Sequence, residues 1–431
     1  MMSAILVSLF ESFRLQRIIE SNQTMDFAVF SSFSLQPAGV RERQRMRAII
    51  LGAILSFAVT LAVPATEKRP RLTDDEVDPE LAAAIINVHA IDNHSHDDPT
   101  SPDRGSNWSP DDPLGKPAYP DVVRLQRDNP DWIQAWRALY GYHYNDLRSD
   151  HLRTLLETKL AMMRKAGERW PAWVLDKAGV EIVFVNAPHL GAGQQNARFR
   201  CVPFADPMLW PFLGRESRMA YPGGKASIAE LMQEAKVATL PSTLDGYEEE
   251  IIQRTLERWK KSGVPAIKFH AANVRGLDFL PVDRDTAARL YGKKFSGGEL
   301  TAAEMKTLED YLFIDIAARA GTLGLVVHVH TGNGNGPYFD NSRANPGLLE
   351  SAIDSEPLHH TKFVLLHGRW PFYLTAQAMM DKPNIYADFS AQTFYLTPHA
   401  LAQVLRGWLE WHPETVVFGS DAYSDANTPL S

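Results

Sequence analysis

Cysteine is almost absent from this chain of 431 residues, where Cys201 is the single one. One cysteine cannot form a disulfide within the chain or build a thiolate zinc cluster, so any metal site must use His, Asp, Glu or Lys side chains. An excess of positive charge is also lacking, because 44 lysines and arginines face 52 acidic residues. Without a basic field the protein is not expected to bind nucleic acid.

The apolar run near the N-terminus is short for a membrane-spanning helix. The apolar run 48–63 is shorter than the roughly 20 residues that cross a bilayer. Four arginines between positions 41 and 47 precede it, and Val63 and Ala65 occupy the small-residue positions of a cleavage site. We therefore interpret 46–65 as a cleaved secretory signal peptide, with an uncleaved anchor as the alternative.

This interpretation makes 1–45 an upstream extension, either a misassigned start or a second anchoring helix. It makes 66–431 the mature protein, beginning near Thr66. We expect this part to be periplasmic or secreted and to have no stable membrane association after cleavage.

Short apolar runs that end in turn residues recur through the mature chain, and helical patterns lie between several of them. The predicted strands are 91–96, 180–186, 199–204, 264–270, 325–330, 363–367, 384–389 and 415–421. The predicted helices are 227–234, 247–261, 302–320 and 398–411. Alternation of strand and helix implies parallel strands with crossovers, so we predict one α/β domain over 66–431, a (β/α)8 TIM barrel.

Two intervals depart from a regular barrel. Residues 97–178 form a long insertion after the first strand, which is expected to emerge over the active-site face. Its aromatic residues predict either a lid over the substrate or a packed helix core; they are Trp132, Trp136, Tyr140 and Tyr142. The sequence ends ten residues after Asp421, so the last helix of the barrel is expected to be truncated.

Residues that can bind metal stand at the carboxyl ends of the predicted strands. His94 and His96 are two residues apart, which places both imidazoles on one face of a strand. His330, His367 and Asp421 each end another apolar strand. Strand alternation also turns Lys268 toward the barrel interior, where a lysine is costly unless it is paired or chemically used.

Together these residues resemble the metal-dependent amidohydrolase superfamily, in its amidohydrolase-related branch. The resemblance rests on HSH, AIKFHAANVRGLDF, VHVHTGNG, LLHGRWPF, NIYADFS and VVFGSDA between residues 86 and 422. It implies that His94 and His96 hold a metal with Asp421, that His330 and His367 complete the site, and that Lys268 is carbamylated and bridges two metals. His270 and His328 are inward-facing rivals as ligands.

A divalent ion held by neutral imidazoles and a carboxylate lowers the pKa of bound water from about 16 toward 7. We expect zinc, with one or two ions per chain. Asp421 is then placed to move the water's proton to a leaving group, while His367 either binds a second metal or donates to the developing oxyanion. Lys268 is a carbamate bridge, a lysine that pairs with substrate or a carboxylate, or a structural ion pair.

The predicted function is a metal-dependent hydrolase that acts on an amide, a lactone or a related bond of a small molecule. The alternatives are a metal-dependent decarboxylase or other lyase, and a non-catalytic envelope protein. Four residues are expected around the mouth of the barrel and are candidates for contact with the substrate, namely Arg275, Tyr338, Asp340 and Arg369. One or both of the arginines could bind a substrate carboxylate. Assembly as a homo-oligomer stays open.

Overall fold

The computed structural model describes residues 80, 83–84, 87–96, 130–187, 190, 197–212, 227–332, 339–368 and 370–422. The predicted signal peptide 46–65 and the extension 1–45 lie outside the described residues, as does the end of the chain where the truncated helix is predicted. Within the described part, no helix combines the length and the apolar character needed to cross a membrane.

Eight strands of the described residues run parallel to their neighbours in the order of the sequence. They are β1 (Ala90–Ser95), β2 (Val180–Ala187), β3 (Phe199–Pro203), β4 (Ala266–Phe269), β5 (Val326–His330), β6 (Phe363–Leu366), β7 (Ile385–Asp388) and β8 (Val416–Val417). Each lies at a predicted position, so the strand prediction is confirmed. The largest difference is β8, whose ladder is shorter than the predicted 415–421.

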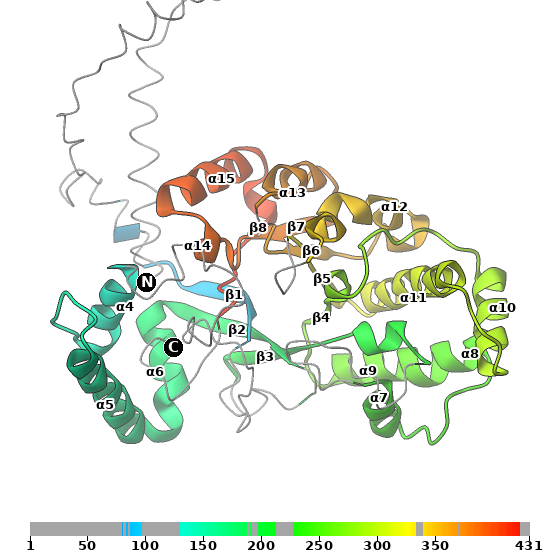
Figure 1. Cartoon of the computed structure of the whole chain (residues 1–431), viewed down its shortest axis with the longest axis horizontal. Coiled ribbons are helices and arrows are strands. Elements are labelled where there is room, and N and C mark those ends of the chain that lie inside the picture. The colour runs from blue at the N-terminus through cyan, green and yellow to red at the C-terminus, as the bar shows by residue number, and fades with distance from the viewer. Residues whose placement is uncertain are drawn as a thin grey trace, which may run out of the picture.

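The strands form a three-stranded sheet, β1–β2–β3, and a five-stranded sheet, β4 to β8. Phe204 after β3 forms a parallel bridge with Lys268 in β4, and the next residue, Ala205, donates from its N–H to the Lys268 carbonyl at 2.8 Å. On the other side, Asn93 in β1 donates to the Phe418 carbonyl at 2.9 Å. These contacts join both sheet edges into one ring, visible in Figure 1. The fold is the predicted TIM barrel.

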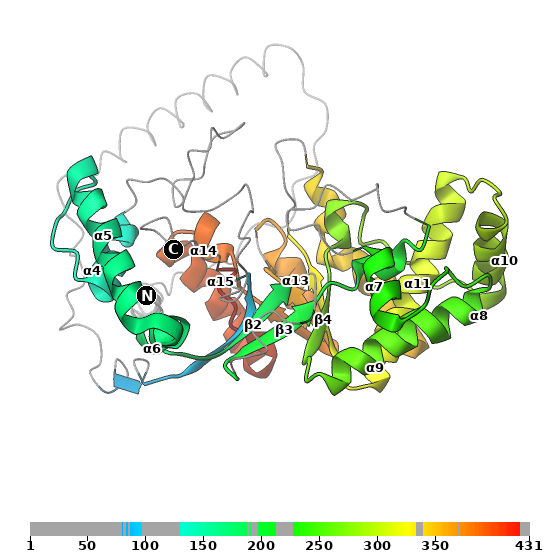
Figure 2. The same ribbon diagram turned by 90° about the horizontal axis from the view of Figure 1, so that it is seen from below.

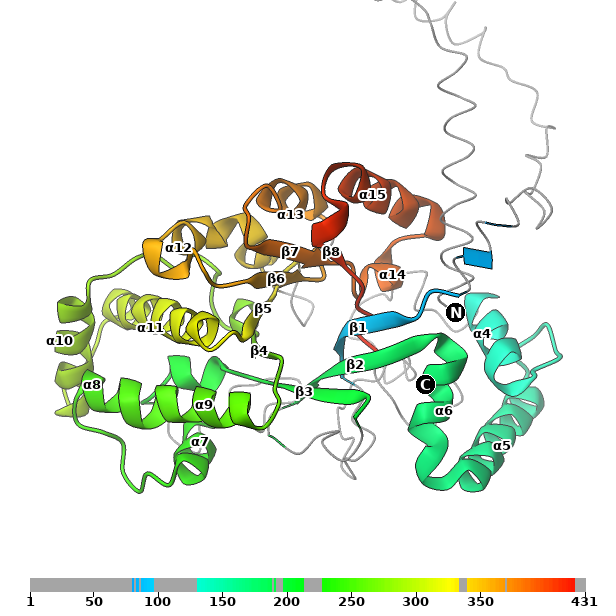
Figure 3. The same ribbon diagram turned by 180° about the vertical axis from the view of Figure 1, so that it is seen from behind.

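Helices occupy the intervals between strands and lie outside the ring (Figures 1 and 3). They are α4 (Pro130–Tyr140), α5 (Ser149–Ala166), α6 (Trp170–Ala178), α7 (Ile228–Ala235), α8 (Leu244–Tyr247), α9 (Arg254–Lys261), α10 (Arg284–Phe295), α11 (Ala302–Thr322), α12 (Glu350–Ile353), α13 (Tyr373–Met379), α14 (Gln392–Tyr395) and α15 (Pro398–Trp411). A π-helical segment, Glu248–Gln253, joins α8 to α9. The four predicted helices are therefore confirmed as α7, α8 with α9, α11 and α15.

The sequence of α11 shows why such a helix forms and how it is held. Thr301 accepts from the N–H of Glu304, whose carboxylate accepts from the N–H of Thr301, so two otherwise unpaired amides at the start are satisfied. Four of its buried residues recur at four-residue spacing on one face; they are Leu308, Leu312, Ile316 and Ala320. At Gly321 a Cβ would lie 2.3 Å from Thr361 Oγ1, so only glycine allows this close approach.

The main hydrophobic core lies between the strands and the outer helices. Phe313 of α11 packs with its ring centroid 4.8 Å from that of Phe269 in β4 and stacks on Phe279 at 3.9 Å. Trp259 and Trp408 are almost completely buried in the same core. Each such side chain contributes roughly 1.5–3 kcal/mol through removal from water, which makes the barrel a rigid frame for the side chains at its rim.

The insertion after β1 contributes α4, α5 and α6, which lie beside β1 and β2 at one side of the barrel (Figures 1 and 2). Trp136 and Tyr142 are buried against Leu155 of α5, with Trp132 and Tyr140 at the edge of this cluster. The aromatic residues therefore form a packed helix core rather than an open lid. Residues 97–129 lie outside the described part, so coverage of the active-site face by the insertion stays a prediction.

Candidate metal centre

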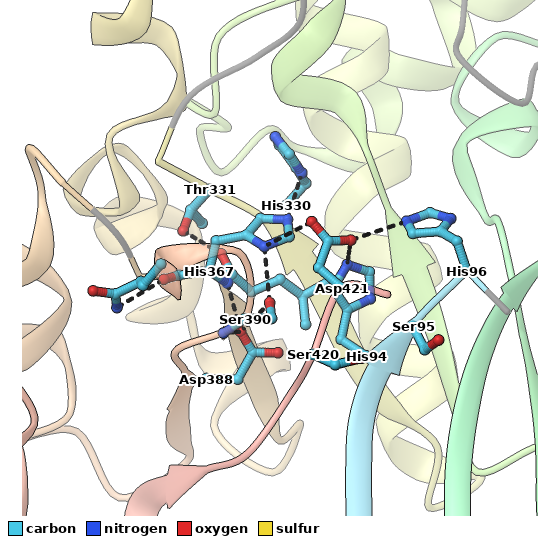
Figure 4. Close-up of polar contacts among 12 residues, drawn as sticks. His94, Ser95, His96, His330, Thr331, His367, Asp388, Ser390, Ser420 and Asp421 are labelled. Atoms are coloured by element: carbon cyan, nitrogen blue, oxygen red, sulfur yellow. Dashed lines mark hydrogen bonds and ion pairs between the residues drawn. The ribbon is translucent and has the colours of Figure 1, made fainter. Parts of the chain in front are cut away.

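Five histidines and an aspartate meet at the carboxyl end of the barrel strands, and Figure 4 labels all of them except His270. Strands β1, β4, β5 and β6 supply the histidines, at or just beyond their last residues, and Asp421 follows β8. Parallel strands end at the same face, so residues more than three hundred positions apart in the sequence are brought together. The set consists of His94, His96, His270, His330, His367 and Asp421.

His94, His96 and Asp421 form the tightest group. Oδ1 of Asp421 lies 3.1 Å from Nε2 of His94 and 3.4 Å from Nε2 of His96. One ligand atom from each residue falls within 4.8 Å of the other two, which is compact enough for one metal ion to contact all three. The structure therefore brings together the three residues predicted to share a cation.

The electrostatic surroundings keep both imidazoles neutral. Burial is the main cause that lowers the pKa of His94 well below its usual value, and the nearby charge of Lys268 lowers it further. The pKa of His96 is also lowered well below its usual value by burial and Lys268, against an opposing effect of Asp421. Neutral imidazoles have a lone pair for a metal, and two imidazoles with one carboxylate form a donor set that suits zinc and similar divalent ions. The residues present therefore fit such an ion.

Lys268 lies inside the barrel, as strand alternation predicts. Its side chain is fully buried, with Nζ 3.3 Å from Nε2 of His94 and 5.6 Å from the ring centre of Phe204. Burial lowers the pKa of Lys268 to about 8, while Asp421, Asp388 and Asp206 oppose that shift. The Lys268 amine is in direct contact with His94, one of the candidate ligands.

His330 and His367 form a second pair beside the first group. Nδ1 of His330 lies 3.0 Å from Nε2 of His367, and Nδ1 of His367 lies 3.8 Å from Oδ2 of Asp421. The His367 ring also stands edge-on to His94, with a centroid distance of 4.9 Å. Asp421 therefore faces both groups.

The two rival histidines lie around this centre. The ring of His270 is 4.5 Å from that of His330, and the Asn273 amide contacts both its nitrogens. His328 lies inside the barrel and stacks toward Phe184 with a centroid distance of 6.4 Å. Burial lowers the pKa of His270 and of His328 to about 3, so both rings are neutral in the folded protein.

The backbone is strained at two of these residues. His367 has φ 72° and Asp421 has φ 56°, values that side chains other than glycine rarely adopt. The N–H of His367 donates to Oδ1 of Asp388 at 2.6 Å, and the N–H of Asp421 donates to the His94 carbonyl at 2.8 Å. Neighbouring strands thus hold the turns that direct both side chains into the centre.

Sequence reasoning did not identify the buried polar residues that support this centre. Asp92 and Asp388 accept backbone and side-chain hydrogen bonds from neighbouring strands, and Ser390 contacts His367. Asn186 contacts Nδ1 of His94 and donates to the Ser95 carbonyl at 3.1 Å. Asn186 ends a predicted strand and Asp388 is the last residue but one of another, so their polar character at those positions was the available signal.

The residues expected at the mouth of the barrel have different outcomes. The guanidinium of Arg275 donates to Glu309 at 2.8 Å and to Asp310 at 2.6 Å, and it stacks on Phe279 at 4.1 Å. These contacts hold the Arg275 side chain against the acidic residues of α11, which argues against a direct role in substrate binding. Tyr338 and Arg369 lie outside the described residues.

Residues 225–427 match the family model described as amidohydrolase. This segment is similar to the amidohydrolase family. It contains β4 to β8, Lys268, His330, His367 and Asp421. No curated protein matches the chain at a significant level.

Solved structures extend the likeness of fold beyond this segment. A Lactobacillus casei protein assigned as a metal-dependent hydrolase has a TM-score of 0.51 and 16% identity, covering 79% of this chain and 83% of its own. A uronate isomerase from Thermotoga maritima has a TM-score of 0.50 and 16% identity, covering 69% of this chain and 68% of its own. At such identities the likeness concerns the fold.

Proposed function

We propose that this protein is a metal-dependent hydrolase that uses water to cleave an amide, a lactone or a related carbon–heteroatom bond in a small molecule. The observation that carries the proposal is the convergence of His94 Nε2, His96 Nε2 and Asp421 Oδ1 at the carboxyl end of the barrel strands. The amidohydrolase match over 225–427 supports the same class of chemistry.

Within this proposal His94, His96 and Asp421 would hold a divalent ion, and His330 would complete its ligand set. We expect zinc because the donor set is made of imidazoles and a carboxylate. When bound, such an ion supplies Lewis acidity that makes water a stronger acid and polarises a carbonyl group.

Asp421 is the residue proposed to move the proton. Its Oδ1 faces His94 and His96, and its Oδ2 faces the His367 ring, so the carboxylate lies at the centre of the polar groups. Asp421 would accept a proton from the attacking water and transfer it to the leaving amine or alkoxide, which balances the hydrolysis.

Two roles are proposed for Lys268. Attack of its neutral amine on carbon dioxide, with loss of a proton, would give a carbamate able to bridge two metals. The contact of Nζ with Nε2 of His94 supports this role, because the amine lies against a proposed metal ligand. An unmodified ammonium at the same point would instead attract a substrate carboxylate.

That second role of Lys268 favours a different reaction. A buried cation beside a metal would fix the carboxylate of an acidic substrate, which suits a decarboxylase or another lyase. Hydrolysis adds water across the broken bond, whereas decarboxylation releases carbon dioxide, so analysis of products separates the two.

The test is metal analysis of the purified protein, followed by a screen of amides, lactones, esters and carboxylic acids. We expect at least one zinc per chain and turnover that is lost after chelation and restored by zinc. The His94→Ala variant is expected to lose zinc and turnover. The His359→Ala variant, changed at an exposed position, is expected to keep zinc and turnover. A wild-type protein that binds no divalent ion and turns over no substrate would refute the proposal.

A further inference from the structure

Four buried side chains from β5, β6 and β7 form a continuous line of hydrogen bonds behind the metal centre: Asp388, Ser390, His367 and His330 (Figure 4). We propose that Asp388 and Ser390 are positioning residues that set the proton positions on both imidazoles and leave Nε2 of His330 as the nitrogen with the lone pair. The inference rests on the proposed function only for the role of His330 as a ligand.

The line starts at a carboxylate surrounded by donors. Oδ1 of Asp388 accepts from the N–H of His367 at 2.6 Å and from the N–H of Ser390 at 3.1 Å, and Oδ2 accepts from the Asn93 amide at 3.2 Å. Asp388 is completely buried. Because these nitrogens can only donate, Asp388 is an acceptor in every one of these contacts.

The hydroxyl of Ser390 links the Asp388 carboxylate to the His367 ring. Oγ lies 2.7 Å from Oδ1 of Asp388 and 2.8 Å from Nδ1 of His367. A hydroxyl has one hydrogen, and the carboxylate takes it because hydrogen bonds to ionised acceptors are the stronger ones. Ser390 therefore accepts from His367, so the imidazole hydrogen is on Nδ1.

The two imidazoles continue the line. A neutral ring with its hydrogen on Nδ1 has its lone pair on Nε2, and this atom of His367 lies 3.0 Å from Nδ1 of His330. His330 must then donate from Nδ1, so its own lone pair is on Nε2. A metal requires a bare imidazole nitrogen, and a fixed hydrogen on the other nitrogen is the usual way to provide one.

The backbone at His367 is built to maintain this direction. Its φ of 72° is stabilised on one side by Asp388 and on the other by Gln392, whose amide donates to the His367 carbonyl at 3.0 Å. Gly419 leaves room for the arrangement, since a Cβ there would lie 2.8 Å from Oδ2 of Asp388. His367 thus receives a role different from second-metal ligation or donation to an oxyanion: it orients His330.

Asp388 could simply hold the turn at His367, and this structural role can be distinguished from the proposed role in setting the imidazole hydrogens. The Ser390→Ala variant removes the hydroxyl but keeps the bond between Asp388 and the His367 backbone, so the turn is preserved while the line to Nδ1 is cut. Thr361→Ala is the matched control, because it also removes a buried hydroxyl, which donates to the Ala317 carbonyl at 3.1 Å, near the opposite end of β6.

The primary readout is the proton position, measured by two-bond proton–nitrogen NMR on the metal-free, 15N-histidine-labelled protein. His367→Gln and His330→Gln assign the two signals. We expect both rings to have hydrogen on Nδ1 in the wild type and in Thr361→Ala, and His367 to shift toward the other tautomer in Ser390→Ala. Hydrogen on Nε2 of wild-type His367, or an unchanged spectrum in Ser390→Ala, would overturn the inference.

The second readout is zinc affinity, measured by competition with a chelating dye. Loss of the outer partner of a ligating histidine costs about 10-fold to 100-fold in metal affinity, and here that partner is His367, whose hydrogen is fixed by Ser390. Ser390→Ala should therefore bind zinc more weakly, by up to about that factor, and Thr361→Ala should not. Equal affinities in wild type and Ser390→Ala would contradict the role assigned to His330. A wild type that binds no zinc would overturn the proposed function, while the NMR result would still decide the proton positions.

Discussion

Asp92 and Ser420 join the first and last strands of the barrel, although they are 328 positions apart in the sequence. Oδ1 of Asp92 accepts from the N–H of Ser420 at 2.9 Å, and Oδ2 accepts from its hydroxyl at 2.5 Å. The same carboxylate accepts from the N–H of His94 at 3.1 Å. Asp92 therefore sets the position of His94 relative to Asp421 as it closes the ring.

Replacement of Asp92 by alanine should loosen this closure. It leaves donors on the partly buried Ser420 and the buried His94 without their acceptor, which costs about 1–3 kcal/mol for each buried group. We expect the free energy of unfolding, measured by urea denaturation, to fall by about 3 kcal/mol. Asp354→Ala removes an exposed carboxylate and is the control, with a loss of at most about 1 kcal/mol. Equal stability of the two variants would contradict the role of Asp92.

The ligand assignment can be tested without a substrate. His94→Ala removes one of the three convergent ligand atoms, so mass spectrometric metal analysis after dialysis should find the zinc content reduced to a small fraction of the wild-type value. The exposed His359 contacts the Asp354 carbonyl at 3.0 Å and is not one of the proposed ligands. His359→Ala should therefore retain full zinc. Stoichiometric zinc in His94→Ala would remove His94 from the ligand set.

The number of metals per chain should report the state of Lys268. A carbamate bridge predicts about two metals, reconstitution that depends on bicarbonate, and partial rescue of Lys268→Ala by short carboxylic acids. An unmodified ammonium predicts one metal, because a buried cation repels a second one. In that case Lys268→Ala keeps its metal and loses mainly substrate affinity. One metal in both proteins, with no response to bicarbonate, would exclude the bridge.

Arg275 should matter for stability rather than for substrate affinity. Its guanidinium is paired with Glu309 and with the buried Asp310, so Arg275→Gln removes the cation from Glu309 and leaves Asp310 with Lys306 alone. Breaking a buried pair in this way costs about 3–5 kcal/mol, measurable by urea denaturation. Arg343→Gln, whose partner Asp340 is 3.7 Å away at an exposed site, should cost less than about 1 kcal/mol. A stable Arg275→Gln protein with a raised KM would restore the substrate-binding role.

Export is predicted by the segment 46–65. If it is a cleaved signal peptide, the chain recovered from the periplasm or the medium should begin near Thr66, as read by N-terminal sequencing or intact mass. Replacement of the four arginines between positions 41 and 47 by glutamine should reduce the exported fraction. A cytosolic protein that retains Met1 would refute both the signal peptide and the periplasmic or secreted location.

Local alternation in the sequence was enough to predict the eight strands, the barrel, the inward direction of Lys268 and the position of His94, His96 and Asp421 at strand ends, while the resemblance to a known family implied that these three share a metal. The predictions from alternation follow from the two-residue period of a strand and from the common end of parallel strands. The commitment of Arg275 to Glu309 and Asp310 was not predictable in this way, because the acids belong to a helix whose packing places them there. The supporting contacts of Asp92, Asp388 and Ser390 depended likewise on ring closure and on the turn at His367. A strand period says nothing about a backbone with positive φ beyond the strand's end, so only the tertiary structure decided which nitrogen of each imidazole meets which neighbour.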